Sequence, residues 1–365
     1  MKVLFLTNYA APYKVQFFDE LGKHMELTVL FSGAEEARTR AAEWFVNGEG
    51  GFQKVFLEKK AGSLGGEHLC LDVIHWLKKG YDRIVIGGYS SPTAMLAMAW
   101  LRMKRIPFYI EVDGGLIRQD SALKYRFKKM LVSSADWWIS SGKYPTKYLV
   151  HYGAREENIY EYPFTSLWER DIAKAVPSEE EKMQLRRELG MEEEKIVLYA
   201  GRFLPEKGMD ALLEAAPALD QTAGVYFVGG EPKQEHLRFC QEKSLTKVHF
   251  VGFQKKDALA RYYKAADVFV LPTKSDVWGL VINEAMACGL PVVTTDQCAA
   301  GLELIQDGVN GYIVPVNDNV ALAEKINAVL GGDCRGMGAA ALEKIRPYTL
   351  ENMVKAHVDI LNDRR

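Results

Sequence analysis

One stretch of this 365-residue sequence spells out a complete strand–loop–helix–strand unit: Val268-Phe-Val-Leu271-Pro-Thr-Lys-Ser-Asp276-Val-Trp-Gly279-Leu-Val-Ile-Asn-Glu284-Ala-Met-Ala-Cys-Gly289-Leu-Pro291-Val-Val-Thr294. The apolar run at each end is short and rich in β-branched residues, which predicts buried strands. The segment between them stops at Gly289 and Pro291, as a helix does. Two strands joined through a helix form the repeating unit of a parallel α/β sheet.

The same alternation of short apolar runs and segments of helical period recurs in both halves of the chain. Most of the runs show no polar alternation, which is typical of strands covered by helices on both faces. We expect strands at 3–7, 27–31, 83–86, 108–112 and 137–139, and then at 196–200, 225–228, 248–251, 268–271, 292–294 and 311–314. The sequence therefore predicts two doubly wound α/β domains with parallel sheets.

The boundary between the two domains is predicted where the strand pattern stops. Residues 168–194 contain Pro177 and the charged run 178–182 but no apolar strand, which indicates a connector with a solvated helix. A chain of this length also exceeds the size at which one core usually stops growing. We expect an N-terminal domain over 1–167, a connector over 168–194, a C-terminal domain over 195–346 and a C-terminal helix over 347–365 that packs on either domain.

Composition and charge exclude several classes of protein. The 46 basic and 48 acidic residues give a net charge of −2, so there is no basic excess to favour nucleic acid. Five scattered cysteines without a CxxC pair indicate neither a disulfide framework nor a zinc cluster, and they fit a reducing cytoplasm. The apolar run after Met1 is too short for a signal peptide, and no run reaches the ~18 residues of a membrane span. Any membrane contact is expected to be peripheral.

Residues that follow strands are the first candidates for chemistry, because parallel α/β sheets bind ligands at the carboxyl ends of their strands. Gly201 and Arg202 follow the strand at 196–200, and Lys207 comes five residues later. Two cations near a helix start suit a diphosphate, although they are equally well explained as solvated loop charges. Gly229 and Gly230 follow the next strand, where they permit close backbone approach to a ligand or simply form a tight turn.

A third candidate follows the strand at 248–251. Gly252 and Phe253 stand there, where backbone groups can meet the edge of a nucleobase. An aromatic side chain at such a position is more often part of the core, so this prediction has little weight.

The quoted stretch supplies the fourth and most informative candidate. Asp276 and Glu284 lie roughly two helical turns apart at about 5.4 Å per turn, so they can hold hydroxyls at two ends of an elongated ligand. Backbone N–H groups of Gly279, Leu280 and Val281 at the helix start can serve a sugar or phosphate between them. The alternatives are a helix cap for Asp276 and an exposed helix face for Glu284. Glu284, however, interrupts an apolar helix, which costs free energy unless the carboxylate is paired or used.

In their order and spacing these four places resemble the retaining glycosyltransferases of family 4. The resemblance covers most of residues 195–318 and rests on Gly-Arg-x4-Lys-Gly from Gly201 to Gly208, on Val-Gly-Gly at 228–230, and on the acidic-x7-Glu helix. It continues through the turn at 301–311. The family implies a GT-B fold, in which two Rossmann-like doubly wound domains face each other across a cleft. One departure concerns the first acidic position, which is usually Glu in the family and is Asp276 here.

The resemblance implies a role for each candidate. Arg202 and Lys207 would neutralise the diphosphate of a UDP- or GDP-sugar donor, Glu284 would bind the ribose, and Asp276 would bind sugar hydroxyls near C3. Backbone amides from Trp278 to Val281 would position the sugar and the phosphate. No cofactor and no catalytic metal are expected, because the cations and helix N–H groups supply the electrostatic stabilisation.

The N-terminal half would then bind a glycan or lipid-linked acceptor. Many members of the family have a histidine near the end of the fourth strand, where this chain reads Glu111-Val-Asp113-Gly-Gly. Asp113 is the nearest polar candidate for a catalytic role. None of the seven histidines follows a strand with an identifiable partner, which disfavours a histidine general base.

A basic stretch in the same half invites a separate interpretation. Between Arg118 and Lys129 it intersperses basic residues with Leu123, Tyr125 and Phe127. Such a pattern fits a helix face that meets an anionic membrane, and it fits an ordinary solvated helix face as well.

Four functions remain open at this point. The leading one is a retaining hexosyltransferase-type enzyme that builds cell-surface polysaccharide or glycolipid in the cytoplasm, at the inner face of the membrane if it binds one. The others are a sugar-nucleotide epimerase or sugar phosphorylase of the same fold, a non-catalytic sugar-nucleotide-binding partner subunit, and a dinucleotide oxidoreductase. The last is disfavoured, because no GxGxxG motif follows the first strand.

Overall fold

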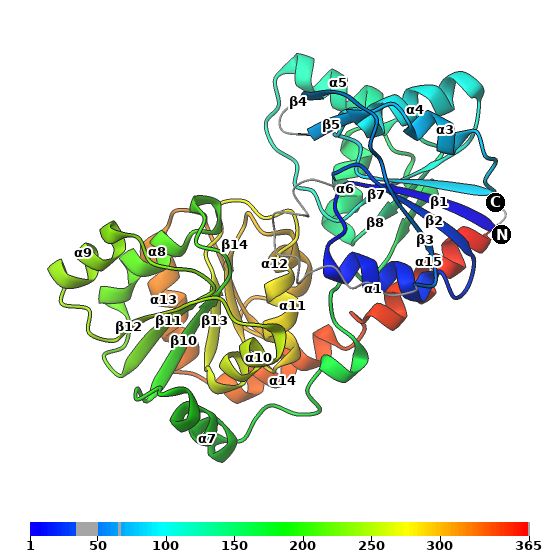
Figure 1. The fold of residues 1–365 in the computed structure, drawn as a ribbon. Coiled ribbons are helices and arrows are strands. Elements are labelled where there is room, and N and C mark those ends of the chain that lie inside the picture. Colours follow the sequence, from blue (N-terminus) through cyan, green and yellow to red (C-terminus); the bar gives the residue numbers. More distant parts are fainter. Residues whose placement is uncertain (34–49, 65–66, 364–365) are drawn as a thin grey trace. The chain divides into compact units, whose positions relative to one another are not determined.

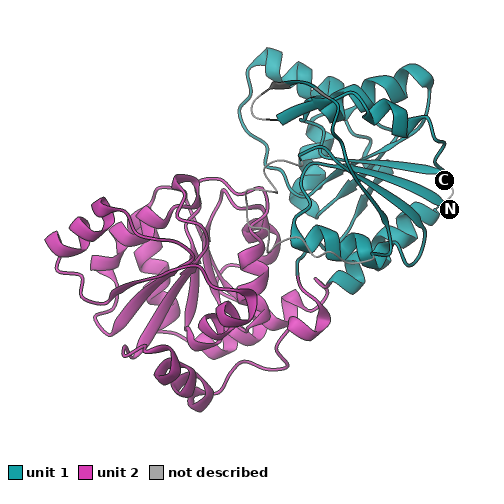
Figure 2. Cartoon of the chain, viewed as in Figure 1, with its two compact units in different colours: residues 1–166, 350–365 teal, residues 167–349 magenta. Residues whose placement is uncertain are grey.

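The computed structural model describes residues 1–33, 50–64 and 67–363. The chain divides into two compact units, shown in teal and magenta in Figure 2. Unit 1 comprises Met1–Ser166 together with Leu350–Arg365, and unit 2 comprises Leu167–Thr349. Each unit is built around its own parallel sheet (Figure 1). The chain therefore returns to its first unit after completing the second.

The sheet of unit 1 contains seven described strands, and every described pairing between them is parallel. Their spatial order is β3 (Gln53–Phe56), β2 (Glu26–Phe31), β1 (Lys2–Thr7), β6 (Arg83–Gly87), β7 (Tyr109–Val112), β8 (Trp137–Ser140) and β9 (Ile159–Glu161). A separate antiparallel pair is formed by β4 (Lys60–Leu64) and β5 (Glu67–Cys70). Since β1 lies inside the sheet and both its neighbours are parallel to it, the sheet is doubly wound.

Both faces of this sheet are covered, which explains the continuous apolar strands. Leu4 and Leu6 of β1 belong to a core that includes buried side chains of the helices α3 to α6, whereas Phe5 between them contacts Phe18 at a ring distance of 5.2 Å. Phe18 belongs to α1, which packs against α15 (Figure 1). The helices are α1 (Pro12–Leu21), α3 (Val73–Leu77), α4 (Pro92–Lys104), α5 (Ala122–Val132), α6 (Lys143–His151) and α15 (Leu350–Asn362), with the 3-10 turn η2 (Glu156–Asn158).

The sheet of unit 2 contains six described strands, again with parallel pairings only. Their order is β12 (Val248–Val251), β11 (Ala223–Val228), β10 (Lys195–Ala200), β13 (Val268–Leu271), β14 (Val292–Thr295) and β15 (Gly311–Val314). The chain winds outward from β10 in both directions. Such a reversal of direction opens a crevice at the carboxyl ends of the central strands, where α/β proteins bind ligands.

The helices of unit 2 follow its strands in alternation. They are α7 (Glu179–Leu189), α8 (Met209–Ala215), α9 (Gln234–Glu242), α10 (Lys256–Ala265), α11 (Leu280–Ala287), α12 (Ala299–Leu304), α13 (Asn319–Leu330) and α14 (Cys334–Ile345), with the 3-10 turns η3 (Glu169–Asp171), η4 (Pro205–Lys207) and η5 (Ala216–Ala218). Among the described residues, no helix is long and apolar enough to cross a membrane.

The segment 168–194 differs from the solvated connector that the sequence suggests. It lies in unit 2, and its helix α7 packs against α10. Two charged residues of α7, Lys182 and Arg186, are buried there and paired with Asp267. The Nζ atom of Lys182 lies 3.0 Å from the carboxylate of Asp267, and Nη2 of Arg186 lies 2.7 Å from it. Most residues of α7 are exposed, in line with the predicted solvated helix, but Lys182 and Arg186 are buried and anchor the helix to Asp267.

Each of the eleven predicted apolar runs contains a strand, and the two sheets confirm the predicted doubly wound class. The sequence analysis missed β3 and β9, which lie at the two edges of the first sheet, and the β4–β5 pair. Residues of β3 and β9 are half-buried or exposed, so these strands lack the apolar run that marks the central ones.

Candidate active site

The four predicted stretches lie along one edge of the unit 2 sheet. Phe253, Gly229 and Gly201 follow β12, β11 and β10, and Asp276 follows β13. These four strands are consecutive in the sheet and run parallel, so the residues that follow them share its carboxyl edge. Residues up to 75 positions apart along the chain, such as Gly201 and Asp276, are thus brought to the same rim.

The predicted glycines Gly229 and Gly230 pack against the loop that follows β10. A Cβ atom on Gly229 would lie 2.6 Å from the carbonyl oxygen of Gly201, and one on Gly230 would lie 2.9 Å from the ring of Phe203. Gly229 also has a φ of 121°, a conformation that disfavours any residue with a side chain. The Val-Gly-Gly turn therefore allows the β10 and β11 loops to pack directly against each other.

The loops after β10 and β13 are bound to each other through one carbonyl group. The oxygen of Glu206 accepts hydrogen bonds from the Thr273 hydroxyl at 2.7 Å and from the Lys274 amide at 2.8 Å. Gly208 lies next to this contact, and a Cβ atom there would be 1.8 Å from the carbonyl oxygen of Pro272. Only glycine permits this approach, which fixes Lys207 relative to the loop that contains Asp276.

Lys207 and Asp276 meet at the junction of these loops. The Nζ atom of Lys207 lies 2.5 Å from Oδ2 of Asp276, and the two side chains are 22% and 12% exposed. A cation and a carboxylate that come from different strand ends, and that remain partly open to solvent, suit a ligand that carries both phosphate and hydroxyl groups. The structure thus brings together two residues that the sequence placed 69 positions apart.

Asp276 is not the cap of the following helix. Helix α11 begins at Leu280, and its N-cap is Gly279, whose φ is 102°. A Cβ atom on Gly279 would lie 2.7 Å from the Cys298 sulfur. The backbone of Asp276 pairs with Gln297 instead, through an N–H···O bond of 3.0 Å. The alternative role for Asp276 is thereby excluded, and its carboxylate remains directed to Lys207.

Trp278 anchors this loop from within. Its side chain is buried and donates from Nε1 to Oδ1 of the buried Asn283 at 2.9 Å. Its carbonyl oxygen accepts from the Ala300 amide at 2.9 Å and from the Cys298 thiol at 3.0 Å. Burial raises the pKa of this thiol to about 12, with the charge of Asp276 as a second cause. The first amides of α11, at Leu280 and beyond, have no partner inside the helix, as at every helix start.

Glu284 lies about one turn after the start of α11 at Leu280, so it is not two helical turns from Asp276 as the sequence suggests, and it is held by a buried tyrosine. The Tyr263 hydroxyl donates to Oε2 of Glu284 at 3.1 Å. Tyr263 is buried in α10, and this burial, together with the nearby Glu284 charge, raises its pKa well above the ordinary value. The tyrosine therefore remains a donor at every physiological pH. Glu284 itself is half-buried, so its carboxylate is both oriented and accessible.

Arg202 and Phe253 occupy more open positions. Arg202 is exposed, and its carbonyl oxygen accepts from the Tyr199 hydroxyl at 3.1 Å. Phe253 is 66% exposed although it follows a strand, which contradicts its interpretation as a core residue. The described contacts do not link either side chain to the pair formed by Lys207 and Asp276. Both remain available at the rim of the sheet.

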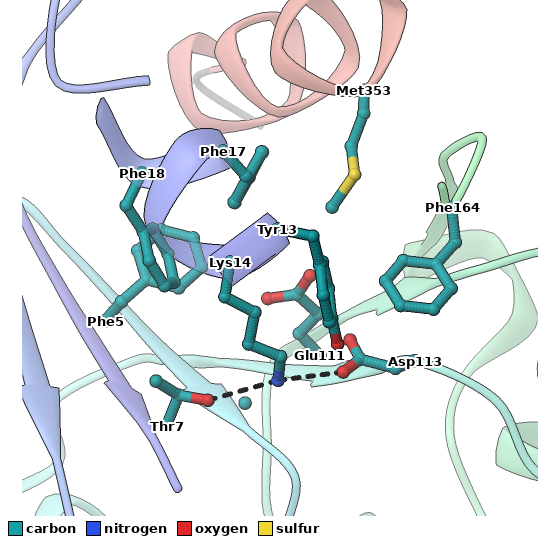
Figure 3. A pocket seen from close by; sticks show the side chains of 11 residues that line it. Phe5, Thr7, Tyr13, Lys14, Phe17, Phe18, Glu111, Asp113, Phe164 and Met353 are labelled. Carbon is teal, nitrogen blue, oxygen red and sulfur yellow. Dashed lines mark hydrogen bonds and ion pairs between the residues drawn. The ribbon is translucent and has the colours of Figure 1, made fainter. Parts of the chain in front are cut away.

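In unit 1 the predicted residue Asp113 borders a pocket at the carboxyl edge of the first sheet (Figure 3). The Nζ atom of Lys14, from the first turn of α1, lies 2.9 Å from Oδ2 of Asp113 and 3.3 Å from the Thr7 hydroxyl. The Tyr162 hydroxyl donates to the other oxygen of Asp113 at 3.2 Å. Burial alone lowers the pKa of Lys14, but the charge of Asp113, the neighbouring Tyr13 and Glu111, and the hydrogen bond to Asp113 together outweigh it, so the net pKa is raised and the lysine is charged.

The remaining lining of this pocket is apolar or belongs to a buried acid–base pair. Phe5, Phe17, Phe18, Phe164 and Met353 form most of its wall (Figure 3). Behind it, the buried Glu111 lies 3.2 Å from Nε2 of His357, whose Nδ1 lies 2.8 Å from the carbonyl oxygen of Met353. His357 is thus a satisfied core histidine.

Three residues of these sites were missed by the sequence analysis. Lys14 follows the first strand by seven positions and lies within the first turn of α1, not directly at the strand end. Tyr263 and Asn283 lie within helices, where nothing local distinguishes a tyrosine or asparagine that supports a neighbouring carboxylate or tryptophan. No group of three or more His, Cys, Asp or Glu side chains that could hold a metal ion is found in the described parts of the chain.

A lysine–aspartate pair, a helix start and a glutamate held by a tyrosine lie along the carboxyl edge of a doubly wound sheet, which is where proteins of the α/β class bind their ligands. The comparison with known families agrees with this class. Residues 181–343 match the family Glycosyl transferases group 1, and the chain belongs to this family through that segment.

Curated relatives match parts of the chain. The Uncharacterized glycosyltransferase MJ1607 of Methanocaldococcus jannaschii is 37% identical over 53% of this chain and 50% of its own length. The D-inositol 3-phosphate glycosyltransferase of Geodermatophilus obscurus is 31% identical over 78% of this chain and 66% of its own. The Phosphatidyl-myo-inositol mannosyltransferase of Mycobacterium leprae is 33% identical over 42% of each. The matches thus span half to two thirds of the first two relatives.

Solved structures match the whole chain. The Anabaena protein Alr3699/HepE, in complex with UDP and glucose, has a TM-score of 0.74 at 20% identity and covers all of both chains. WaaG, a glycosyltransferase involved in lipopolysaccharide biosynthesis, has a TM-score of 0.67 at 16% identity over 99% of both. At this level of identity the likeness establishes the fold, which is GT-B, as predicted.

Proposed function

We propose that this protein is a retaining glycosyltransferase that moves a hexose from a nucleotide-diphosphate sugar to a hydroxyl group of a glycan or a lipid-linked acceptor. The observation that carries the proposal is the contact between Lys207 and Asp276, together with the tyrosine-bound carboxylate of Glu284 in the helix that follows Asp276. It lies inside the segment that matches the glycosyltransferase family. A pathway that makes cell-surface polysaccharide or glycolipid in the cytoplasm is part of the proposal, and the five scattered cysteines, without a CxxC pair, support this compartment.

The donor contacts that we propose all involve residues of unit 2. Lys207 and the exposed Arg202 neutralise the diphosphate, while Glu284 accepts hydrogen bonds from the ribose hydroxyls. Asp276 accepts from hydroxyls of the sugar, and the amides at the start of α11 bind the phosphate. Gly252 and Phe253 border the base. UDP or GDP is the expected nucleotide, because a related fold has been solved with UDP and a related sequence is named for mannosyl transfer.

The transfer step needs stabilisation of a leaving diphosphate. The bond between sugar C1 and the diphosphate oxygen breaks, the acceptor oxygen bonds to C1 on the same face, and the proton of the acceptor hydroxyl passes to the leaving phosphate. Positive charge aimed at that phosphate stabilises the transition state more than the ground state, which is the task of Lys207. In unit 1, Asp113 accepts from an acceptor hydroxyl.

A panel of nucleotide sugars tests the proposal directly. Thermal unfolding is followed with UDP-, GDP-, ADP- and dTDP-sugars, and a donor at 100 times its Kd stabilises the protein by about 2.7 kcal/mol. Products made with the best donor are then analysed by NMR for the configuration at C1. If none of the donors raises the unfolding temperature, or if the product has inverted configuration, the proposal is wrong.

The same experiment separates the other functions of this fold. An epimerase converts the donor to a second nucleotide sugar without any acceptor, and a binding subunit is stabilised by donor but neither hydrolyses nor transfers it. Metal independence, which belongs to the proposal, is tested by assaying transfer in excess EDTA. Loss of activity that Mg²⁺ or Mn²⁺ restores would contradict it.

A further inference from the structure

Helix α5 carries an apolar stripe that the structure leaves on its surface. Leu123, Phe127 and Met130 are 81%, 46% and 58% exposed, and their spacing of four and three residues places them on one side of the helix. Ile117, just before the helix, is 50% exposed as well. Four of the large exposed apolar side chains of unit 1 are thus gathered in 14 consecutive residues.

The opposite side of α5 holds the helix to unit 1. Leu131 and Val132 are buried, and Tyr125 packs on Tyr152 with the ring centroids 5.6 Å apart. Lys128 turns inward with them, because its Nζ atom lies 2.8 Å from Asp120. The apolar stripe is therefore not a core face of the helix, which has its core contacts elsewhere.

Positive charge flanks the stripe on both sides. At 100° per residue, Arg126 and Lys129 lie on one side of it and Lys124 lies on the other, and all three are exposed. Lys124 also forms an ion pair with Asp120, with Nζ 3.1 Å from Oδ1, so Arg126 and Lys129 supply most of the unneutralised charge. Asp120 is the only acidic residue from 114 to 135. Its carboxylate is 3% exposed, and hydrogen bonds from Lys128 and Tyr152 hold its pKa below the ordinary value, so it stays ionised and paired. The exposed surface of α5 is apolar in the middle and basic along its edges.

We propose that this surface, formed by Leu123, Phe127, Met130 and their basic neighbours Lys124, Arg126 and Lys129, binds an anionic lipid bilayer. Apolar side chains enter the interface between headgroups and acyl chains while the flanking cations meet lipid phosphates. An acidic protein would match the charge but not a stripe of large aliphatic and aromatic side chains that are exposed to solvent. The inference does not depend on the proposed transferase activity, since it concerns unit 1 alone.

Vesicle sedimentation with the full-length chain tests the proposal. Vesicles of phosphatidylcholine with about 40% phosphatidylglycerol bind the protein, and vesicles of pure phosphatidylcholine bind it at least tenfold less. Raising NaCl from 50 to 500 mM weakens binding, because surface charge is screened. Since neither vesicle contains a glycosyl acceptor, binding cannot arise from substrate recognition.

Two variants locate the surface. Arg126→Ser with Lys129→Ser lowers the partition coefficient roughly 30-fold, at about fivefold for each cation near an anionic surface. Leu123→Ser with Phe127→Ser and Met130→Ser lowers it at least tenfold at any salt concentration. The control for the basic variant is Arg238→Ser with Lys243→Ser. The control for the apolar variant is Met183→Ser with Leu237→Ser and Val320→Ser. Both controls alter exposed residues of unit 2 and leave binding unchanged.

Thermal unfolding verifies that each variant is folded, which the exposure of all the substituted side chains predicts. The proposal is overturned if anionic and neutral vesicles bind alike, if the α5 variants bind as the wild type does, or if the unit 2 controls lose as much binding. Capture by an acidic polypeptide such as polyglutamate with equal affinity would also overturn it, in favour of a protein partner.

Discussion

Lys207 and Asp276 form one ion pair, yet in the proposed function they bind different parts of the donor. Lys207 serves the diphosphate and Asp276 serves the sugar, so donor binding must open or share their 2.5 Å contact. A carboxylate with one more methylene group, as the family usually has, would extend further past the lysine. The shorter Asp276 thus sets where a sugar hydroxyl must lie to be bound.

Replacing Lys207 by alanine removes the cation that meets the leaving group. We expect kcat/KM for transfer to fall by at least about 10²-fold, as for other lost transition-state contacts. The matched control is Lys195→Ala, because Lys195 and Asp220 form a similar partly exposed pair at 3.0 Å on the same sheet. Steady-state kinetics should show the control within about threefold of the wild type. Equal losses in both variants would mean that Lys207 only supports the fold.

The hydrogen bond from the Tyr263 hydroxyl to Glu284 gives a second prediction. Tyr263→Phe removes the hydroxyl that orients Glu284, so we expect KM for the donor to rise about three- to tenfold while kcat changes little. The pair formed by Tyr226 and Glu193, with a hydrogen bond of 2.7 Å, gives the control Tyr226→Phe. A rise in KM in both variants, or a fall in kcat alone, would contradict a positioning role for Tyr263.

At the scale of the element, α7 shows how a helix that looks solvated is attached. Its buried Lys182 and Arg186 share one acceptor, Asp267, which also accepts from the Ile196 amide at 2.8 Å. Asp267→Ala leaves two buried cations unpaired, and a broken buried ion pair typically costs about 3–5 kcal/mol. We expect the unfolding temperature of unit 2 to fall markedly in calorimetry.

The comparison is an exposed ion pair between Glu188 of the same helix and Arg261 of α10. Glu188 lies 2.5 Å from Arg261, but both side chains are more than 40% exposed. Exposed pairs contribute about 0–1 kcal/mol, so Glu188→Ala should leave the unfolding temperature nearly unchanged. If the two variants were equally stable, the buried basic residues of α7 would not be its anchor.

Elements of this fold differ in how far the sequence predicts them. The central strands were found because burial on both faces makes them continuously apolar, as Val3 to Leu6 illustrate. The edge strands β3 and β9 depend on pairing with a neighbour, which leaves no local pattern. Asp276 and Glu284, like the central strands, were predicted from a local pattern, because both belong to one short stretch of sequence. The contacts of Lys207 with Asp276 and of Lys14 with Asp113 exist only once distant strand ends meet.

At the scale of the whole molecule, unit 1 is assembled from both ends of the chain. His357 of α15 is fully buried and lies 3.2 Å from Glu111 of β7, while its ring packs on Phe17 at 4.7 Å. Arg83 also donates to the carbonyl oxygen of Leu361 at 3.2 Å. The last helix is thus a layer of the first sheet and not an appendage to the second unit.

A chain that ends at Thr349 tests this dependence. Loss of α15 uncovers Phe17 and leaves Glu111 buried without its histidine, so unit 1 should lose most of its protection in hydrogen exchange. Unit 2 should keep its protection, because α15 belongs to unit 1. A chain that ends at Asp363 is the control and should behave as the full chain does. Unchanged protection of β1 and β7 in the shorter chain would refute the dependence.

The position of α15 also has a consequence for biosynthesis. On the ribosome, the first 166 residues emerge well before their covering helix, and the 183 residues of unit 2, from 167 to 349, must be translated in between. At about 5–20 residues per second this delay is roughly 10 to 40 seconds. During that time the nascent α1 surface is not covered by α15. Unit 2 can therefore finish folding before unit 1, and a chaperone has time to bind the incomplete unit 1.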